Sequence, residues 1–470
     1  MVLRLLQTIT ASEMIMNKIN RLFKGRGLVM SVSLFHLFTF SPLSAQEKLW
    51  SLRECCDYAV EHSISIKQQE NLCRQQELEL STAKNSRLPD LNGSVSQSFS
   101  FGRGLTAENT YSNTNTSNTS LGISTSVPLF TGFRIPNEIK LNQLNLEAAT
   151  ADLEKAKNDI RMKVAEAYVQ ILYDMEIADV ARRQIEIDSA QVARLDAFVK
   201  NGKAAEAELS QQKATLANSR LTATQADNNT RLAILALTQL LELPTPDGFS
   251  IVRPDVAEIT QLSSFNSQLL TPDMIYAEAL GVKPEILSQQ LKLKGTEHSI
   301  KIAKSANYPS LSLSGSVGTN YYTTSGFNSD TFGNQLKNNF SQGIGLNLSV
   351  PIFNRFQTRN NIRNARINQE NQQLALDNTK KTLYKEIQQV YYNALNAQTK
   401  EKSSEEALQS TKDAFQLMQA KYENGKATIT EFNESKNNYL KSESDLVQAR
   451  YENLYQQALL EFYRGRELTF

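Results

Sequence analysis

The residues that most often carry enzyme chemistry are scarce in this sequence. Beyond its N-terminal segment, histidine occurs only at His62 and His298, and cysteine only at Cys55, Cys56 and Cys73. Metal sites and nucleophilic centres need such side chains at particular spacings, and this set matches neither a zinc pattern nor a disulfide framework. We interpret the cysteines as small apolar residues on a helix. With no glycine-rich phosphate loop and no catalytic triad, we predict no enzyme activity, no metal and no cofactor.

The charge balance bears on the class of partner. The chain has 470 residues, with 50 Lys and Arg against 49 Asp and Glu. Nucleic-acid-binding proteins usually carry a basic excess, so we expect no nucleic-acid partner.

Residues 1–45 have the pattern of a secretory signal peptide. Basic residues between Lys18 and Arg26 precede an apolar stretch at 28–40, and Leu43-Ser44-Ala45 ends the segment before Gln46. This order is typical of an exported protein. The apolar stretch is shorter than the roughly 20 residues that a membrane-spanning helix needs. An N-terminal membrane anchor is the alternative.

The sequence repeats itself at a constant offset. Val127-Pro128-Leu129-Phe130 returns 223 residues later as Val350-Pro351-Ile352-Phe353, and Asn201-Gly202-Lys203 returns at the same offset as Asn424-Gly425-Lys426. A fixed internal period indicates repeated structural units. We divide the chain into a first repeat at 46–243, a connecting segment at 244–270 and a second repeat at 271–470.

Each repeat contains a pair of alternating segments, at about 91–128 and about 311–351. Apolar residues such as Val95 and Phe99 alternate with serine and asparagine, which is the pattern of strands with one apolar face. Their length approaches the roughly 9–11 residues of a tilted strand that crosses a bilayer. The segments at 102–118 and 322–341 are rich in Asn, Thr, Ser and Gly, and we expect long surface loops there.

Helical periodicity replaces alternation after each strand pair. Short helices are expected at 52–62 and 271–280, long helices at about 136–199 and about 359–422, and return helices at 206–243 and 431–464. Residues 137–199 and 360–422 contain neither Pro nor Gly, so each long helix could reach roughly 95 Å. In the first, apolar residues recur at spacings of four and three, as in coiled coils, interrupted by Asp174 and Asp188.

Four membrane strands cannot close a barrel within one chain. Open sheet edges are not tolerated in lipid, and single-chain barrels begin at about eight strands. The economical solution is a symmetric ring of identical chains.

The order of helix, strand pair, long helix, glycine turn and return helix, given twice, resembles the TolC-like outer-membrane efflux proteins. The resemblance rests on residues 127–133, 350–356 and 422–431 together. It implies a mainly α protein with membrane β: a homotrimer with a twelve-stranded β-barrel in the outer membrane of a Gram-negative cell, continued by an α-barrel of long coiled helices through the periplasm. Such a channel works with a periplasmic adaptor protein and an inner-membrane transporter to export small molecules or proteins.

The resemblance also assigns residues at the periplasmic tip. Glu431 and Glu434 match acidic positions that line the closed pore end, and their spacing puts both on one helix face. Threefold symmetry would stack them as two carboxylate rings that favour cations, and crowding would raise some of their pKa values. Alternatively, Glu431 forms a capping box with Thr428 and complements the helix dipole.

A polar lock and an adaptor contact are implied as well. Tyr422 and Glu208 match two members of the lock; its basic member falls on Ala427, which leaves Lys426 as the nearest substitute. The turns at Asn201-Gly202 and Asn424-Gly425 match the sites where family members meet the adaptor. Plain helix termination is the alternative for these glycines.

A second hypothesis is a periplasmic coiled-coil adaptor or scaffold without a pore. Two helical hairpins and four alternating segments favour the channel, because an adaptor would normally contain one hairpin and a lipoyl-like or barrel domain.

Overall fold

The structure is a computed structural model, and it describes residues 49–105, 109–254 and 271–468. The predicted signal peptide and most of the predicted connecting segment lie outside these residues. Among the described residues, no helix combines the length and the apolar character needed to cross a membrane.

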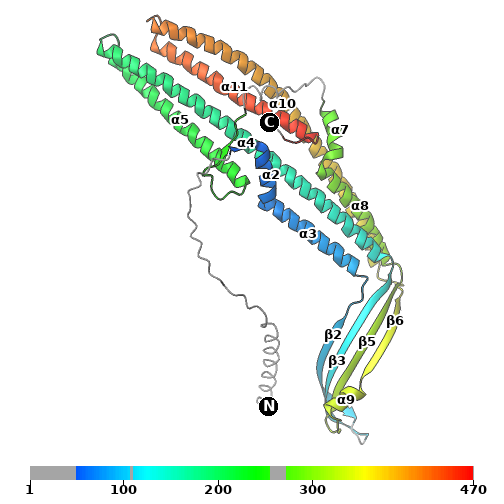
Figure 1. Cartoon of the computed structure of the whole chain (residues 1–470). Coiled ribbons are helices and arrows are strands. Elements are labelled where there is room, and N and C mark those ends of the chain that lie inside the picture. The colour runs from blue at the N-terminus through cyan, green and yellow to red at the C-terminus, as the bar shows by residue number, and fades with distance from the viewer. Residues whose placement is uncertain (1–48, 106–108, 255–270, 469–470) are drawn as a thin grey trace, which may run out of the picture. The chain divides into compact units, whose positions relative to one another are not determined.

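The first half of the chain places one strand pair between helices (Figure 1). Its elements are β1 (Leu49–Trp50), α2 (Leu52–His62), α3 (Ile64–Asn85), β2 (Asn92–Leu105), β3 (Tyr111–Thr131), α4 (Arg134–Lys200), α5 (Glu206–Leu240) and β4 (Ser250–Ile251). Helix α2 begins where the sequence predicts, because Ser51 and Glu54 form a capping box that satisfies its first backbone N–H groups.

The second half repeats this order. Its elements are α7 (Pro272–Val282), α8 (Pro284–Ser305), β5 (Ser310–Thr324), α9 (Phe332–Asn338), β6 (Ser341–Ser349), α10 (Gln357–Glu423) and α11 (Ile429–Tyr463). Helices α4 and α10 both contain 67 residues, or ~100 Å of helix. Each extends the predicted helix by one to two residues at both ends, whereas the return helix α5 ends three residues earlier than predicted.

The prediction of a long loop at 102–118 is wrong. Strand β2 continues to Leu105 and β3 already begins at Tyr111, because Thr116 and its neighbours pair with both β2 and β5. The predicted loop at 322–341 contains the short helix α9. Strand β3 also runs past Pro128 to Thr131, with an irregular register between Pro128 and Phe130, as expected where a proline cannot donate to the ladder.

Strands β2, β3, β5 and β6 form one antiparallel sheet in that order. Its register brings the apolar residues onto one face: Val95 pairs with Leu121, Ile123 with Val317, and Leu313 with Leu346. Directly opposed residues of an antiparallel pair share a face, so the alternation predicted from the sequence becomes a continuous apolar surface. That surface is exposed in the single chain, with Val95 75% and Leu346 65% accessible.

Helices α3, α4, α5, α8, α10 and α11 pack side by side in one layer. Near the strands, α4 lies between α3 and α8, and α8 lies between α4 and α10. Near the turns, α4 lies between α5 and α11, and α11 lies between α4 and α10 (Figure 1). Helix α4 therefore has neighbours on both sides throughout, whereas α3, α5 and α10 lie at the edges of the layer.

The largest apolar core lies where the two halves of the layer meet. Residues from α2, α3, α4, α5, α7, α8, α10 and α11 contribute, among them Ile171, Leu237 and Ile275, each fully buried. The two-stranded parallel sheet of β1 and β4 closes over this core. The Tyr168 hydroxyl ties it to α4 by donating to the carbonyl of Val252 over 2.7 Å.

Candidate functional site at the helix turns

The turns that end α4 and α10 have the same backbone geometry. Gly202 and Gly425 lie at φ +68° and +70°, a left-handed conformation that glycine adopts without strain. The N–H of Lys203 donates to the carbonyl of Phe198, and the N–H of Lys426 to that of Lys421, both over 2.8 Å. These bonds satisfy carbonyls at the helix ends in the Schellman arrangement.

The side chains at these turns are open to solvent. The Asn201 and Asn424 amides cap their own helices by donating to the carbonyls of Ala197 and Ala420 over 2.7 and 2.8 Å. A Cβ added at Gly202 or Gly425 would meet no atom within 4 Å, so the glycines are needed for backbone conformation and not for close packing. Both the helix-termination role and an exposed contact surface are compatible with this geometry.

Glu431 forms the capping box that the sequence suggested as an alternative. Its carboxylate accepts hydrogen bonds from the Thr428 N–H and hydroxyl over 2.7 and 2.8 Å. These bonds stabilise the charged form, so the pKa of Glu431 lies below its usual value in the single chain. Glu434 is exposed one turn further along α11. The rise in pKa expected from neighbouring copies stays a prediction.

Tyr422 lies in a cluster that joins the two helical hairpins. Its ring stacks on that of Phe432 with 5.0 Å between the two centroids. The guanidinium of Arg194 lies 5.4 Å from the centroid of the Tyr422 ring. Arg194 also donates to the Glu423 carbonyl over 2.9 Å. Burial raises the pKa of Tyr422, while Arg194 lowers it and the carboxylate of Glu208 raises it.

Two of the three predicted lock residues are thus near each other, and a basic residue that the sequence did not suggest joins them. Glu208 is exposed but close enough to act on Tyr422. The Lys426 side chain has no hydrogen-bond or ion-pair partner within the part of the chain that the structure describes. The basic side chain beside Tyr422 in the single chain is Arg194 of α4. No local signal links Arg194 to this cluster, since Tyr422 and Glu423 are more than 200 residues away in sequence.

A buried charged network connects the hairpins two turns further along α11. The carboxylate of Asp188 and the ammonium of Lys436 are in contact, and both side chains are fully buried. Asp188 also accepts hydrogen bonds from Gln212 over 3.2 Å and from Ser219 over 2.5 Å. The residue that interrupted the predicted apolar seam therefore binds α4 to α5 and α11. Removing one partner of such a buried ion pair strongly destabilises the fold, because the other charge stays buried without compensation.

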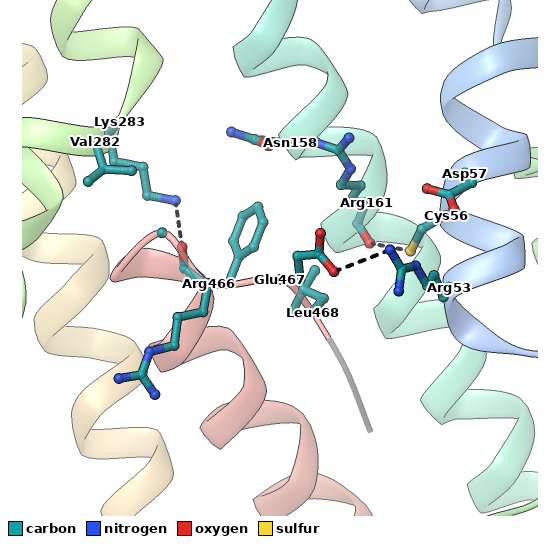
Figure 2. A pocket seen from close by; sticks show the side chains of 12 residues that line it. Arg53, Cys56, Asp57, Asn158, Arg161, Val282, Lys283, Arg466, Glu467 and Leu468 are labelled. Carbon is teal, nitrogen blue, oxygen red and sulfur yellow. Dashed lines mark hydrogen bonds and ion pairs between the residues drawn. The ribbon is translucent and has the colours of Figure 1, made fainter.

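A polar cavity of about 250 Å³ lies between α2, α4, the α7–α8 junction and the residues after α11 (Figure 2). Lys283 points into it and donates to the Phe462 carbonyl over 3.3 Å, and burial lowers the pKa of its ammonium. Cys56 contributes its thiol, whose pKa burial raises to about 12, so the thiol stays protonated and unreactive near neutral pH. Cys55 is also buried, and Cys73 is half-buried.

Metal-ligating side chains are not grouped in the described ranges. No set of three or more His, Cys, Asp or Glu side chains there is arranged to hold an ion. His62 instead stacks on Tyr58, and His298 bonds to Asn137 over 2.9 Å.

Known proteins match the chain in both halves. The family model described as outer membrane efflux protein matches residues 57–242 and 275–466. The outer membrane efflux protein BepC of Brucella suis is 22% identical over 294 residues, covering 62% of this chain and 58% of that protein. The fusaric acid resistance protein FusA of Burkholderia cepacia is 24% identical over 279 residues, covering 58% of this chain and 49% of that protein. The chain thus spans about half the length of the curated relatives it matches.

Solved structures share the fold over more of the length. The Campylobacter jejuni CmeC outer membrane channel superposes with a TM-score of 0.72 at 19% identity, covering 95% of each chain. The outer membrane protein VceC of Vibrio cholerae superposes with a TM-score of 0.71 at 18% identity, covering 89% of this chain and 97% of that one.

The fold and the family are those of transport proteins and not of enzymes. Because the family model covers most of both repeats, the chain belongs to the outer membrane efflux protein family and lies in the outer membrane of a Gram-negative cell.

Proposed function

We propose that three copies of the chain assemble into a channel that passes through the outer membrane and extends into the periplasm. The observation that carries this proposal is that the sheet and the helix layer end in open edges on matching sides. One edge is formed by β2 and α3, which are consecutive in sequence, and the other by β6 and α10, which are also consecutive.

Edges that match in this way favour a ring. Strands β2 and β6 each have one unpaired side within the described chain, and unpaired backbone groups are not tolerated in lipid. If β6 and α10 of one copy contact β2 and α3 of the next, a single rotation pairs the strand edges and packs the helix edges together. A head-to-tail contact of this kind produces a cyclic oligomer when the rotation closes. Three copies give twelve strands, within the range of known barrels of about 8 to 26.

The helical turns form the periplasmic end of this channel. Glu431 and Glu434 would constrict the pore as two rings of carboxylates, with Glu431 also capping α11. Tyr422, Glu208 and Arg194 would hold the hairpins together as the lock, and the exposed Lys426 would reach a neighbouring copy. Asn201, Gly202, Asn424 and Gly425 present the exposed surface that an adaptor would contact.

The cargo is exported with the help of partners. In this proposal a periplasmic adaptor protein and an inner-membrane transporter supply the energy, and the chain supplies a passive conduit for small molecules or proteins. Neither the fold nor the family favours the alternative of a scaffold without a pore.

Single-channel conductance in a planar bilayer tests the pore and its constriction. We expect a small cation-selective conductance that divalent cations block. In Glu431→Gln/Glu434→Gln the block should be lost, while glutamine at position 431 can still complete the capping box. The matched control Glu405→Gln/Glu406→Gln removes two exposed charges from α10 and should keep the block. Unchanged block in the first variant would show that these residues do not form the constriction. No conductance from a verified trimer would point to a tightly locked tip or to the scaffold without a pore.

A further inference from the structure

Helix α10 has three different sides in its first half. Its buried and half-buried residues recur at spacings of four and three, and Gln372 in this row donates to Gln289 of α8 over 2.7 Å. The row facing α8 consists of Thr358, Ile362, Ala365, Gln369, Gln372 and Leu376, and Leu383 continues it seven residues later. Successive helical residues are about 100° apart, so residues one position after or before this row lie on the two opposite faces of the helix layer.

Three arginines occupy one of these faces. Arg359, Arg363 and Arg366 each follow a member of the row by one residue, and all three are exposed. In the described part of the chain, none of them forms an ion pair, whereas Arg134 at the start of α4 is paired with Glu138 over 3.0 Å. They therefore present three positive charges within the first three turns of α10, and the first carboxylate on this face, Glu370, follows Arg366 by one turn without an ion pair between the two.

The opposite face has no charge over the same turns. Asn361, Asn364, Asn368 and Asn371 each precede a member of the row by one residue, and all are exposed. An uncharged polar surface suits the wall of a water-filled passage. The difference between arginine and asparagine thus distinguishes the two faces of the layer.

The position of α7 identifies the arginine face as the outer one. Tyr384 follows Leu383 by one residue, as the arginines follow their row, and its hydroxyl donates to Asp273 of α7 over 2.7 Å. Helix α2 lies on this face too, since α2, α4 and the α7–α8 junction line one cavity. Elements packed over the inner face would obstruct a passage, so α2, α7 and the arginines lie outside.

We propose that Arg359, Arg363 and Arg366 bind phosphate groups of anionic phospholipids in the periplasmic leaflet of the outer membrane. This inference rests on the proposed insertion of the strands into that membrane. Helix α10 begins eight residues after β6 ends, and the connecting segment exposes Ile352 and Phe353 by 96% and 70%. Apolar and aromatic side chains followed by basic ones are the order expected at a membrane interface. Guanidinium groups bind phosphate oxygens in a bidentate manner.

A neighbouring copy is a less suitable partner for these charges. The end of α3 and the residues just after it, which would meet the start of α10 across the ring, include Lys84 and Arg87. The adjacent end of α8 carries Lys301 and Lys304. These residues add positive charge around the arginines, and anionic headgroups would neutralise the whole group.

Thermal unfolding of the purified full chain in detergent tests the proposal. Phosphatidylglycerol, phosphatidylcholine and inorganic phosphate are titrated separately, and the rise in Tm gives the apparent affinity for each. Wild type should be stabilised by phosphatidylglycerol more than by phosphatidylcholine. Arg359→Gln/Arg363→Gln/Arg366→Gln should weaken the phosphatidylglycerol affinity at least about tenfold, given the attraction of each basic residue to an anionic lipid surface.

Two variants control for folding and for net charge. Lys402→Gln/Lys412→Gln/Lys441→Gln removes three exposed charges far from the strands and should keep the lipid preference. Arg359→Lys/Arg363→Lys/Arg366→Lys keeps the positive charges and should retain part of the preference. An unchanged preference in the glutamine triple variant, or the same stabilisation by inorganic phosphate alone, would overturn the proposal. Insertion of each variant into phosphatidylcholine vesicles is measured in parallel: failure of wild type there refutes the proposed function, whereas insertion without a lipid preference refutes only this inference.

Discussion

Helices α4 and α10 have the same length and corresponding places in the two repeats, yet they are buried to different extents. Nineteen residues of α4 are buried against eight of α10, although each helix has 67 residues. Within the layer, α4 has neighbours on both sides along its whole length, whereas α10 has neighbours, α8 and α11, on one side only.

The uncovered side of α10 is partly apolar. Ile367 and Leu374 lie two positions from the row that faces α8, on the opposite side of the helix, and are 54% and 60% exposed. Leu78 of α3, at the other edge of the layer, is 68% exposed. Helix α4 is thus buried within the single chain, whereas α10 leaves uncovered the apolar side that the proposed ring would cover.

The largest effect is expected from the buried pair that connects α4 to α11. Lys436→Ala leaves the Asp188 carboxylate buried without its partner, and we expect a loss of about 3–5 kcal/mol in unfolding free energy. Denaturant unfolding followed by helical circular dichroism measures it. The exposed Lys441→Ala is the control and should change stability little; equal stability of the two variants would show that the pair does not hold the hairpins together.

Truncations on the two long helices compare how much each one stabilises the single chain. Ile171→Ala removes a fully buried side chain of α4 and should cost about 2–5 kcal/mol. Leu374→Ala on α10 should change the stability of the separate chain by less than about 0.5 kcal/mol, but it should lower the fraction of oligomer in detergent. Native mass spectrometry reports that fraction. Similar losses of chain stability from both variants would contradict the assignment of α10 to an edge.

The return helices differ at their first residues, and the expected effect is smaller. Thr428 caps α11 with a side-chain bond, whereas Ala205 offers none to α5. Thr428→Ala should lower the unfolding free energy by about 1 kcal/mol. Ala205→Thr should raise it by part of that amount, because it adds a capping side chain to α5. Amide hydrogen exchange in the first turns of α5 and α11 measures both changes. No change in protection at α11 would mean that the cap adds nothing to the tip.

The pH dependence of the same cap is the smallest effect. The pKa of Glu431 is lowered from its usual value of 4.5 in the folded chain. Its contribution to stability is therefore fully present above the unfolded value, and it is lost as pH falls below 4.5 through the lower folded pKa. Protection of the start of α11 should decline over that acidic range in wild type and less in Thr428→Ala. A parallel decline in both would assign the pH dependence to other groups.

Elements that follow from a local sequence pattern could be predicted, and features that require contact between distant parts of the chain could not. The runs without Pro or Gly located α4 and α10 to within two residues at each end, because nothing in them interrupts a helix. The start of β3 was missed because Tyr111 and the Asn-Thr residues after it have no apolar alternation; pairing with β2 and β5 makes them a strand. Arg194 was missed because its contacts cross from one hairpin to the other.

The candidate site shows the same division. The capping box of Thr428 and Glu431 could be predicted from residues three positions apart. The position of Asp188 on the apolar seam predicts that it is buried. Its partner Lys436 could not be predicted, because it is 248 positions away in sequence.

Cross-linking between the two edges tests whether α10 of one copy contacts α3 of the next. Leu78→Cys/Ile367→Cys, with Cys73 replaced by serine, is treated with a short bismaleimide in detergent and separated under denaturing conditions. Each residue lies at an open edge of the layer, within about three helical turns of the strands. The account predicts a ladder that ends at three copies, formed only when both cysteines are present. A monomer band alone from an intact oligomer would contradict the contact of α10 with α3 of the next copy.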